Sequence, residues 1–169
     1  EDRQIEEKTM ASFERVFDTK ADSAYLLGRH LRPAGLRWVV FFSSVAGRFG
    51  NQGQVDYAAA NEVVNRLACQ FDAQWPATRV AAINWGPWRG AGMATQGIQR
   101  QFVAKGISAI DAGDGRRFFV DELTYGQKGE VEIVAGEGPW KVDSDQQLSS
   151  LLELGALFLG RRELNDLPQ

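Results

Sequence analysis

Two nearly uninterrupted apolar runs predict two buried strands, RWVVFF at residues 37–42 and RVAAINW at residues 79–85. A continuous apolar run, unlike an alternating one, is typical of a parallel strand that is covered on both faces. Residues 57–74 between them carry apolar side chains at helical spacing, which predicts an amphipathic helix. A strand–helix–strand unit of this kind predicts parallel strands joined by a right-handed crossover.

The residues between the first strand and this helix, 43–56, contain three glycines and predict a loop, with Asp56 as the helix N-cap. Three parallel strands form an incomplete sheet, and the strand at 37–42 needs a neighbour on each side. We therefore expect a missing N-terminal part to supply further strands. The hydrophobic periodicity also predicts helices at 8–18, 19–31, 92–104 and 113–124, a strand at 131–136 and an apolar, helical or linker-like tail at 146–169.

The composition narrows the class of protein further. The chain has 169 residues, of which 44% are hydrophobic, and a formal net charge of -3. This charge argues against nucleic acid as a partner. The single cysteine, Cys69, can form no internal disulfide, which favours a cytoplasmic location. No apolar run is long enough for a membrane span or follows the charged start as in a signal peptide. Because the chain begins with Glu1, we expect a piece of a longer protein.

Three separate segments are expected to meet at one edge of the sheet. Ser43 and Ser44 follow the first strand, and Gly86, Pro87 and Trp88 follow the second. The helix that begins near Tyr57 starts between them. Because ligands of open parallel sheets bind beyond the carboxyl ends of the strands, this edge is the predicted site. No cluster of Cys and His has the spacing of a metal site, so no metal is predicted.

The polar residues at this edge suit the reduction of a carbonyl group. Tyr57 can donate the proton if a nearby ammonium, for which Lys20 is the candidate, lowers its pKa from about 10. Ser44 can hydrogen-bond the carbonyl oxygen as negative charge develops there. Asn61, four residues after Tyr57, shares its helix face and can position Lys20 or a water molecule. Alone, each would more often be a surface residue or a turn former, but the joint pattern favours a site.

The sequence resembles a ketoreductase domain of a polyketide synthase, in the short-chain dehydrogenase/reductase superfamily. The matching segments are VFDTK (16–20), FFSSVAGRFGNQGQVDYAAAN (41–61) and INWGPWRGAGMA (83–94). Ordinary members of the superfamily carry a lysine four residues after the tyrosine, where this chain has Asn61. The upstream Lys20 is typical of synthase-type ketoreductases. The phrase around Tyr57 is most similar to iterative synthases for enediynes or polyunsaturated fatty acids.

This resemblance implies a Rossmann-like, doubly wound α/β fold, of which residues 1–145 would be the C-terminal catalytic half. It implies NADPH-dependent reduction of a β-ketoacyl thioester, carried on an acyl carrier protein, to a β-hydroxyacyl thioester. Neighbouring synthase domains and the missing N-terminal half, which would carry the glycine-rich dinucleotide fingerprint, are the implied partners. By position, Tyr57 would be the proton donor, Ser44 would bind the carbonyl, Lys20 would bind the cofactor ribose, Asn61 would support Lys20, and Gly86, Pro87 and Trp88 would line the nicotinamide end.

The resemblance also assigns residues to substrate binding and stereocontrol: Asp2, Phe49, Gln54 and Met93. A tryptophan eight residues before the tyrosine marks one hydroxyl configuration in this family, and Phe49 stands there instead. An acidic motif marks the opposite configuration, and its last aspartate corresponds to Asp2. This combination implies the B-type class and a D-configured (3R) alcohol. Two alternatives stay open, a non-catalytic half-domain that braces a synthase and a free-standing dehydrogenase that acts on another carbonyl.

Overall fold

The computed structural model describes residues 2–90 and 102–140. The predicted tail at 146–169, its boundary with residues 1–145 and most of the predicted helix at 92–104 lie outside this range. No helix in the described ranges is both long and apolar enough to cross a bilayer. In chain order the elements are η1 (Ile5–Glu7), α1 (Met10–His30), β1 (Trp38–Ser44), α2 (Val45–Phe49), α3 (Val55–Gln74), β2 (Arg79–Trp85), α5 (Ala112–Tyr125) and β3 (Glu132–Ala135).

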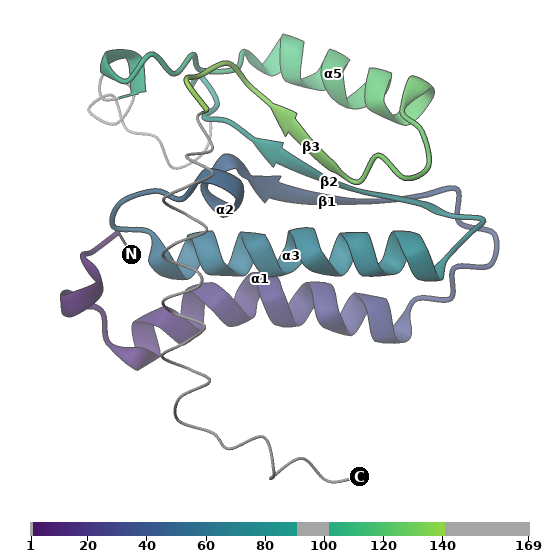
Figure 1. Ribbon diagram of the computed structural model, residues 1–169, viewed down its shortest axis with the longest axis horizontal. Helices are drawn as coiled ribbons and strands as arrows, with labels where there is room; N and C mark the ends of the chain where they lie inside the picture. Colours follow the sequence, from purple (N-terminus) through teal and green to yellow (C-terminus); the bar gives the residue numbers. More distant parts are fainter. Residues whose placement is uncertain (1, 91–101, 141–169) are drawn as a thin grey trace, which may run out of the picture. The chain divides into compact units, whose positions relative to one another are not determined.

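The three strands form one parallel sheet in the order β1-β2-β3. All three arrows point the same way in Figure 1. The predicted strands and their parallel direction are thereby confirmed. Each residue of β1 faces one of β2, from the pair Trp38 and Arg79 to the pair Ser44 and Trp85. The carboxyl ends of these two strands therefore lie level with each other.

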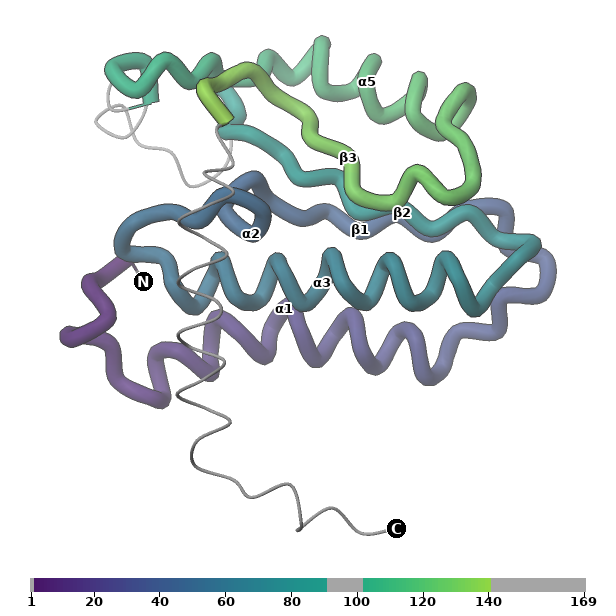
Figure 2. Tube along the Cα trace, viewed as in Figure 1, coloured from purple at the N-terminus to yellow at the C-terminus, as the bar shows by residue number. Residues whose placement is uncertain are grey.

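Helices cover both faces of the sheet, as in other α/β folds. α1 and α3 run side by side along one face, and α5 lies on the other (Figures 1 and 2). β2, in the middle, is buried along its whole length. Two apolar clusters result. The first, toward α1 and α3, contains Ala24, Phe41, Val64, Ala68, Phe71, Trp75, Val80 and Ala82, and the second, toward α5, contains Ile83, Trp85 and Ala135 with Val40, Trp88, Ile110, Phe118 and Phe119 around them.

The first strand is less buried than its apolar sequence predicts. Trp38 is 38% exposed and Phe42 is 54% exposed. Within residues 2–90 and 102–140, β1 pairs only with β2, so its other edge has no strand beside it. The expectation of a strand covered on both faces was wrong for this chain by itself. Because β1 is an edge strand of the described sheet, side chains such as Trp38 and Phe42 have fewer neighbours than those of β2.

The helix boundaries also differ from the predicted ones. The two helical patterns at 8–18 and 19–31 form the single helix α1, because no glycine or proline separates them. Thr9 caps it through Oγ1, which accepts from Ser12 N at 3.2 Å. The predicted loop at 43–56 contains the end of β1, the short helix α2 and the first two residues of α3. Asp56 is therefore not the N-cap, which is Gln54, but lies inside the helix.

At Gly28, α1 packs directly against the Phe71 ring of α3. A Cβ atom placed there would overlap Cζ of the Phe71 ring, so the ring would have to shift. We expect Gly28→Ala to lower the free energy of unfolding by about 1–3 kcal/mol, as overpacked core positions do. Thermal and urea unfolding would measure the loss.

Gly113→Ala is the matched control, because nothing lies within 4 Å of its Cβ position in α5. There the better helix propensity of alanine should keep or slightly raise stability. Equal effects of the two substitutions would contradict the close packing of α1 on α3.

Candidate active site

The predicted site lies where β1 ends and α3 begins. Ser44 is the last residue of β1 and the N-cap of α2, and its Oγ accepts from Ala46 N at 3.2 Å. Tyr57 is in the first turn of α3 and is half-buried. The sheet register places Ser44 beside Trp85, the last residue of β2. The segments that the sequence predicts to converge therefore meet at one edge.

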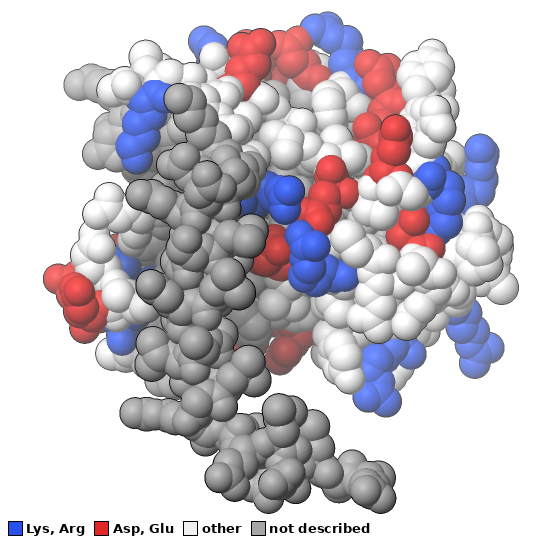
Figure 3. Space-filling model, in the orientation of Figure 1, with Lys and Arg blue, Asp and Glu red and all other residues white. Residues whose placement is uncertain are grey.

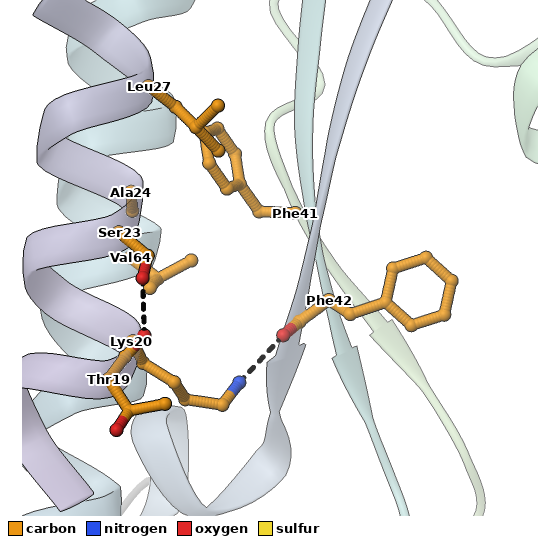
Figure 4. Close-up of a pocket in the computed structure, with 8 residues that line it drawn as sticks. All are labelled: Thr19, Lys20, Ser23, Ala24, Leu27, Phe41, Phe42 and Val64. Atoms are coloured by element: carbon orange, nitrogen blue, oxygen red, sulfur yellow. Dashed lines mark hydrogen bonds between the residues drawn. The ribbon is translucent and has the colours of Figure 1, made fainter. Parts of the chain in front are cut away.

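Lys20 reaches this edge from the middle of α1. Its Nζ donates to the backbone oxygen of Phe42 at 2.9 Å and to Asn61 Oδ1 at 2.8 Å. Figure 4 shows the ammonium pointing at β1 while the Phe42 ring turns to the opposite face. An ammonium has three N–H donors, and the described residues accept two hydrogen bonds from it, so the third can bond a ligand. Lys20 also lines a pocket between α1 and β1, together with Thr19, Ser23, Ala24, Leu27, Phe41, Phe42 and Val64.

Asn61 connects Lys20 to Tyr57. Its side chain is fully buried, and its Nδ2 donates to the backbone oxygen of Tyr57 at 2.7 Å. Its own backbone oxygen accepts from Ser43 Oγ at 3.3 Å. Lys20 Nζ lies 5.6 Å from the centre of the Tyr57 ring. The structure thus brings three of the four predicted residues into one connected group, with Ser44 one residue beyond Ser43.

Burial lowers the pKa of Lys20 below its ordinary value of 10.5. Relative to the unfolded chain, the folded state shifts Lys20 toward the neutral amine, so the unfolded chain binds more protons between the lowered pKa and 10.5. We expect the free energy of unfolding to rise with pH through this window because of Lys20. NMR titration of ¹³Cε-labelled lysine would locate the midpoint, and a midpoint at or above 10.5 would contradict the burial of Nζ.

The residues assigned to stereocontrol meet in part. Gln54 Nε2 donates to both carboxylate oxygens of Asp2, at 3.0 and 2.9 Å. The next residue, Arg3, donates its backbone N–H to Gly53 O at 2.9 Å. Phe49 ends α2. Met93 lies outside the described residues, so its predicted position over the substrate stays a prediction.

The residues after β2 are held by the layer that contains β3 and α5. Gly86 N donates to Ala135 O at 2.8 Å, and Pro87 O accepts from Ile110 N at 2.8 Å. The Trp88 ring packs 4.9 Å from the Trp85 ring, and a Cβ atom on Gly115 would overlap it. The Trp88 indole therefore faces α5. Residues 86–88 therefore present mainly backbone groups to a ligand at the site.

Sequence reasoning overlooked three partners of the site. Ser43 was expected at this edge but was given no role, and the backbone oxygen of Phe42 was not expected to bond Lys20. The ion pair between Lys8 and Asp56, with Nζ and Oδ2 2.8 Å apart, joins residues far apart in the chain. No local pattern in the sequence predicts such an ion pair.

The donor set fits a nicotinamide cofactor better than a metal. The available groups are an ammonium, a phenol and a hydroxyl, which suit ribose and carbonyl oxygens. In the described part of the chain, no three His, Cys, Asp or Glu residues cluster so that they could hold a metal ion. Basic and acidic side chains are interspersed over the face shown in Figure 3.

Residues 1–90 match the family described as KR domain, which is more than half of the chain. The chain belongs to the KR domain family. It is thus part of a ketoreductase domain of the polyketide synthase type, in the short-chain dehydrogenase/reductase superfamily. This confirms the resemblance seen in the sequence and the α/β fold with its parallel sheet.

Two curated relatives illustrate how this ketoreductase chain matches others. It is 38% identical over 114 residues to a component of the polyunsaturated fatty acid synthase of Thraustochytrium sp., covering 68% of this chain and 4% of the relative. It is 36% identical over 124 residues to spectinabilin polyketide synthase system protein NorB of Streptomyces orinoci, covering 70% of this chain and 6% of the relative. The chain thus spans a small part of these proteins.

The fold is similar to that of a solved ketoreductase from the first module of phoslactomycin biosynthesis in Streptomyces sp. HK803. The TM-score is 0.72 at 28% identity, over 82% of this chain and 31% of that one. A C2-type ketoreductase from a modular polyketide synthase gives a TM-score of 0.71 at 25% identity, over 83% of this chain and 30% of the other. The chain therefore corresponds to about a third of a solved ketoreductase.

Proposed function

We propose that this ketoreductase reduces a β-ketoacyl thioester on an acyl carrier protein to a β-hydroxyacyl thioester, with NADPH as the reductant, inside a synthase. The observation that carries the proposal is the connected group at the sheet edge. Lys20 Nζ bonds Asn61 Oδ1 at 2.8 Å, and Asn61 Nδ2 bonds the backbone oxygen of Tyr57 at 2.7 Å. These contacts hold an ammonium near a phenol at the place where parallel sheets bind ligands.

Each residue has one task in the proposed reaction. NADPH, when bound, supplies the hydride that the β-carbon of the ketone accepts. Tyr57 gives its phenolic proton to the carbonyl oxygen, so that the C=O bond becomes a hydroxyl. Ser44 donates a hydrogen bond to the same oxygen and stabilises its developing charge. Lys20 favours the phenolate that Tyr57 becomes, since opposite charges attract strongly at a partly buried site.

The cofactor would be held partly by residues of this chain. The third N–H of Lys20 suits a ribose hydroxyl, and the backbone of Gly86, Pro87 and Trp88 suits the nicotinamide end. The phosphate-binding loop and any preference for NADPH over NADH belong to the part of the fold that solved ketoreductases have in addition. We propose that this part adds a parallel strand at the edge of β1 where Phe42 is 54% exposed.

The stereochemical proposal is a D-configured (3R) product. The pair of hydrogen bonds between Asp2 and Gln54 supports it, because it fixes the predicted acidic marker beside the turn that leads to Tyr57. Phe49, three residues after Ala46, stands where the opposite class has tryptophan. The carrier-bound substrate, the neighbouring synthase domains and a cytoplasmic location complete the proposal.

The test requires this chain together with the remaining part of the ketoreductase fold. NADPH oxidation would be followed with a β-ketoacyl thioester, first on a small thiol and then on an acyl carrier protein, and the product would be resolved on a chiral column. We expect turnover, a preference for the carrier-bound substrate and the (3R) alcohol. A folded protein that binds no cofactor would overturn the proposal in favour of a bracing role. Turnover that is indifferent to the carrier would favour a free-standing dehydrogenase.

A further inference from the structure

The segment before α1 is fastened to the first turn of α3 by a buried ion pair. Lys8 Nζ and Asp56 Oδ2 lie 2.8 Å apart, and their side chains are only 4% and 2% exposed. Lys8 stands two residues before Met10, where α1 begins, and Asp56 directly precedes Tyr57. The pair thus connects the start of the Lys20 helix to the start of the Tyr57 helix.

The Asp56 carboxylate also holds the Tyr57 backbone. While Oδ2 accepts from Lys8, Oδ1 accepts from Tyr57 N at 2.9 Å. The first N–H groups of a helix have no partner within the helix, so this bond fills a need of the first turn. A negative charge there also interacts favourably with the helix dipole. One carboxylate therefore fixes both the Tyr57 peptide and the Lys8 ammonium.

Asp56 is held in its charged form despite its burial. Burial by itself raises the pKa of Asp56, but the hydrogen bond from Lys8, the bond from Tyr57 N and the charge of Lys8 together lower it below its ordinary value. Removal of Lys8 would leave a buried and unpaired carboxylate, which proteins tolerate poorly. The position of the Tyr57 peptide therefore depends on a residue 48 positions before Asp56 in the chain.

We propose that Lys8 and Asp56 are a positioning pair for Tyr57, which together set the place of its phenol relative to Lys20 and the substrate. The proposal rests on the proposed function, because it assigns to Tyr57 the proton transfer. It assigns no contact with substrate or cofactor to either residue. Misplacement of a reacting group by about 1 Å can cost about a hundredfold in rate, so the pair should matter for turnover.

Two variants separate positioning from mere stability. Lys8→Met breaks the pair and should lower both Tm and kcat. The double variant Lys8→Met/Asp56→Leu removes both charges, and an apolar replacement of a buried ion pair often restores stability. It also removes the acceptor of the Tyr57 N–H. We expect the double variant to regain Tm relative to Lys8→Met, yet to keep a kcat at least about tenfold below wild type with the KM for the thioester unchanged.

Glu122→Gln is the matched control. Glu122 pairs with Arg79 at the start of β2, with side chains 15% and 7% exposed, so this pair is comparably buried. It lies at the opposite end of β2 from Trp85 and the site. We expect its loss to lower Tm and to leave kcat within about twofold, as buried pairs remote from the chemistry act on stability alone.

Amide hydrogen exchange at Tyr57 gives a measurement that needs no turnover. Exchange should be faster in the double variant and unchanged in Glu122→Gln. A kcat of the double variant within about twofold of wild type, or unchanged exchange at Tyr57, would overturn the proposal. If the wild type folds and turns nothing over, the proposed function fails, and the exchange rates alone decide whether Asp56 holds the Tyr57 peptide.

Discussion

Tyr57→Phe is expected to reduce ketone turnover by about a hundredfold to ten-thousandfold, the range that a positioned proton donor contributes. Phenylalanine keeps the ring that lies 5.6 Å from Lys20 Nζ and removes only the hydroxyl. Because the side chain is half-buried, stability should change little. NADPH oxidation with a β-ketoacyl thioester measures the loss, and cofactor binding measured by fluorescence should persist.

Tyr125→Phe is the control for this change. Tyr125 is the last residue of α5 and is 76% exposed, and no role at the site is proposed for it. It should leave turnover unchanged. Equal turnover of wild type and Tyr57→Phe would contradict the assignment of Tyr57 as the proton donor. No other described phenol lies at the carboxyl ends of the strands.

Lys20→Met is expected to have the second largest effect, on cofactor affinity as well as on turnover. Charge-assisted hydrogen bonds contribute about 1.5–3 kcal/mol, so affinity should fall by about tenfold to a hundredfold, with a further loss in kcat. Folding should be little affected. Methionine removes the cost of burying an ammonium, and this gain offsets the loss of the donor to the oxygens of Phe42 and Asn61. Cofactor titration and steady-state kinetics measure the two losses separately.

Lys128→Met is the matched lysine control. Lys128 Nζ contacts Asp72 Oδ1 at 2.7 Å, Trp75 O at 3.1 Å and Thr78 O at 2.9 Å, at the far end of α3 from Tyr57. The Lys128→Met variant should therefore be less stable than wild type but keep its turnover per folded molecule. If both lysine variants lost turnover in proportion to their stability, Lys20 would have a structural role only.

The parts of the fold that depend on long local patterns could be predicted from the sequence. The strand at 79–85 matches β2 to the residue, and the helix at 113–124 matches α5 within one residue at each end. The structure also brings Lys20, Tyr57 and Asn61 together, while their roles at a site stay a prediction. In each case the residue types and their spacing carry the information locally.

What depends on tertiary contacts could not be predicted. The helix α2 has only five residues, too few for a periodic pattern, and its cap is a serine that looks like a turn former. α3 begins at Val55 although Gln54 makes no side-chain cap, so the usual start signal is lacking. The burial of Asp56 depends on Lys8, 48 positions away, which no local pattern encodes.

The order of the strands has a consequence for how the sheet can form during synthesis. Because β1, β2 and β3 lie side by side in chain order, each strand can pair with the one made just before it. Neighbouring pairings need shorter loop closures and fold faster than distant ones. β2, the most buried strand, becomes covered on its second edge when β3 leaves the ribosome. The described sheet can therefore grow in the direction of translation, from β1 to β3.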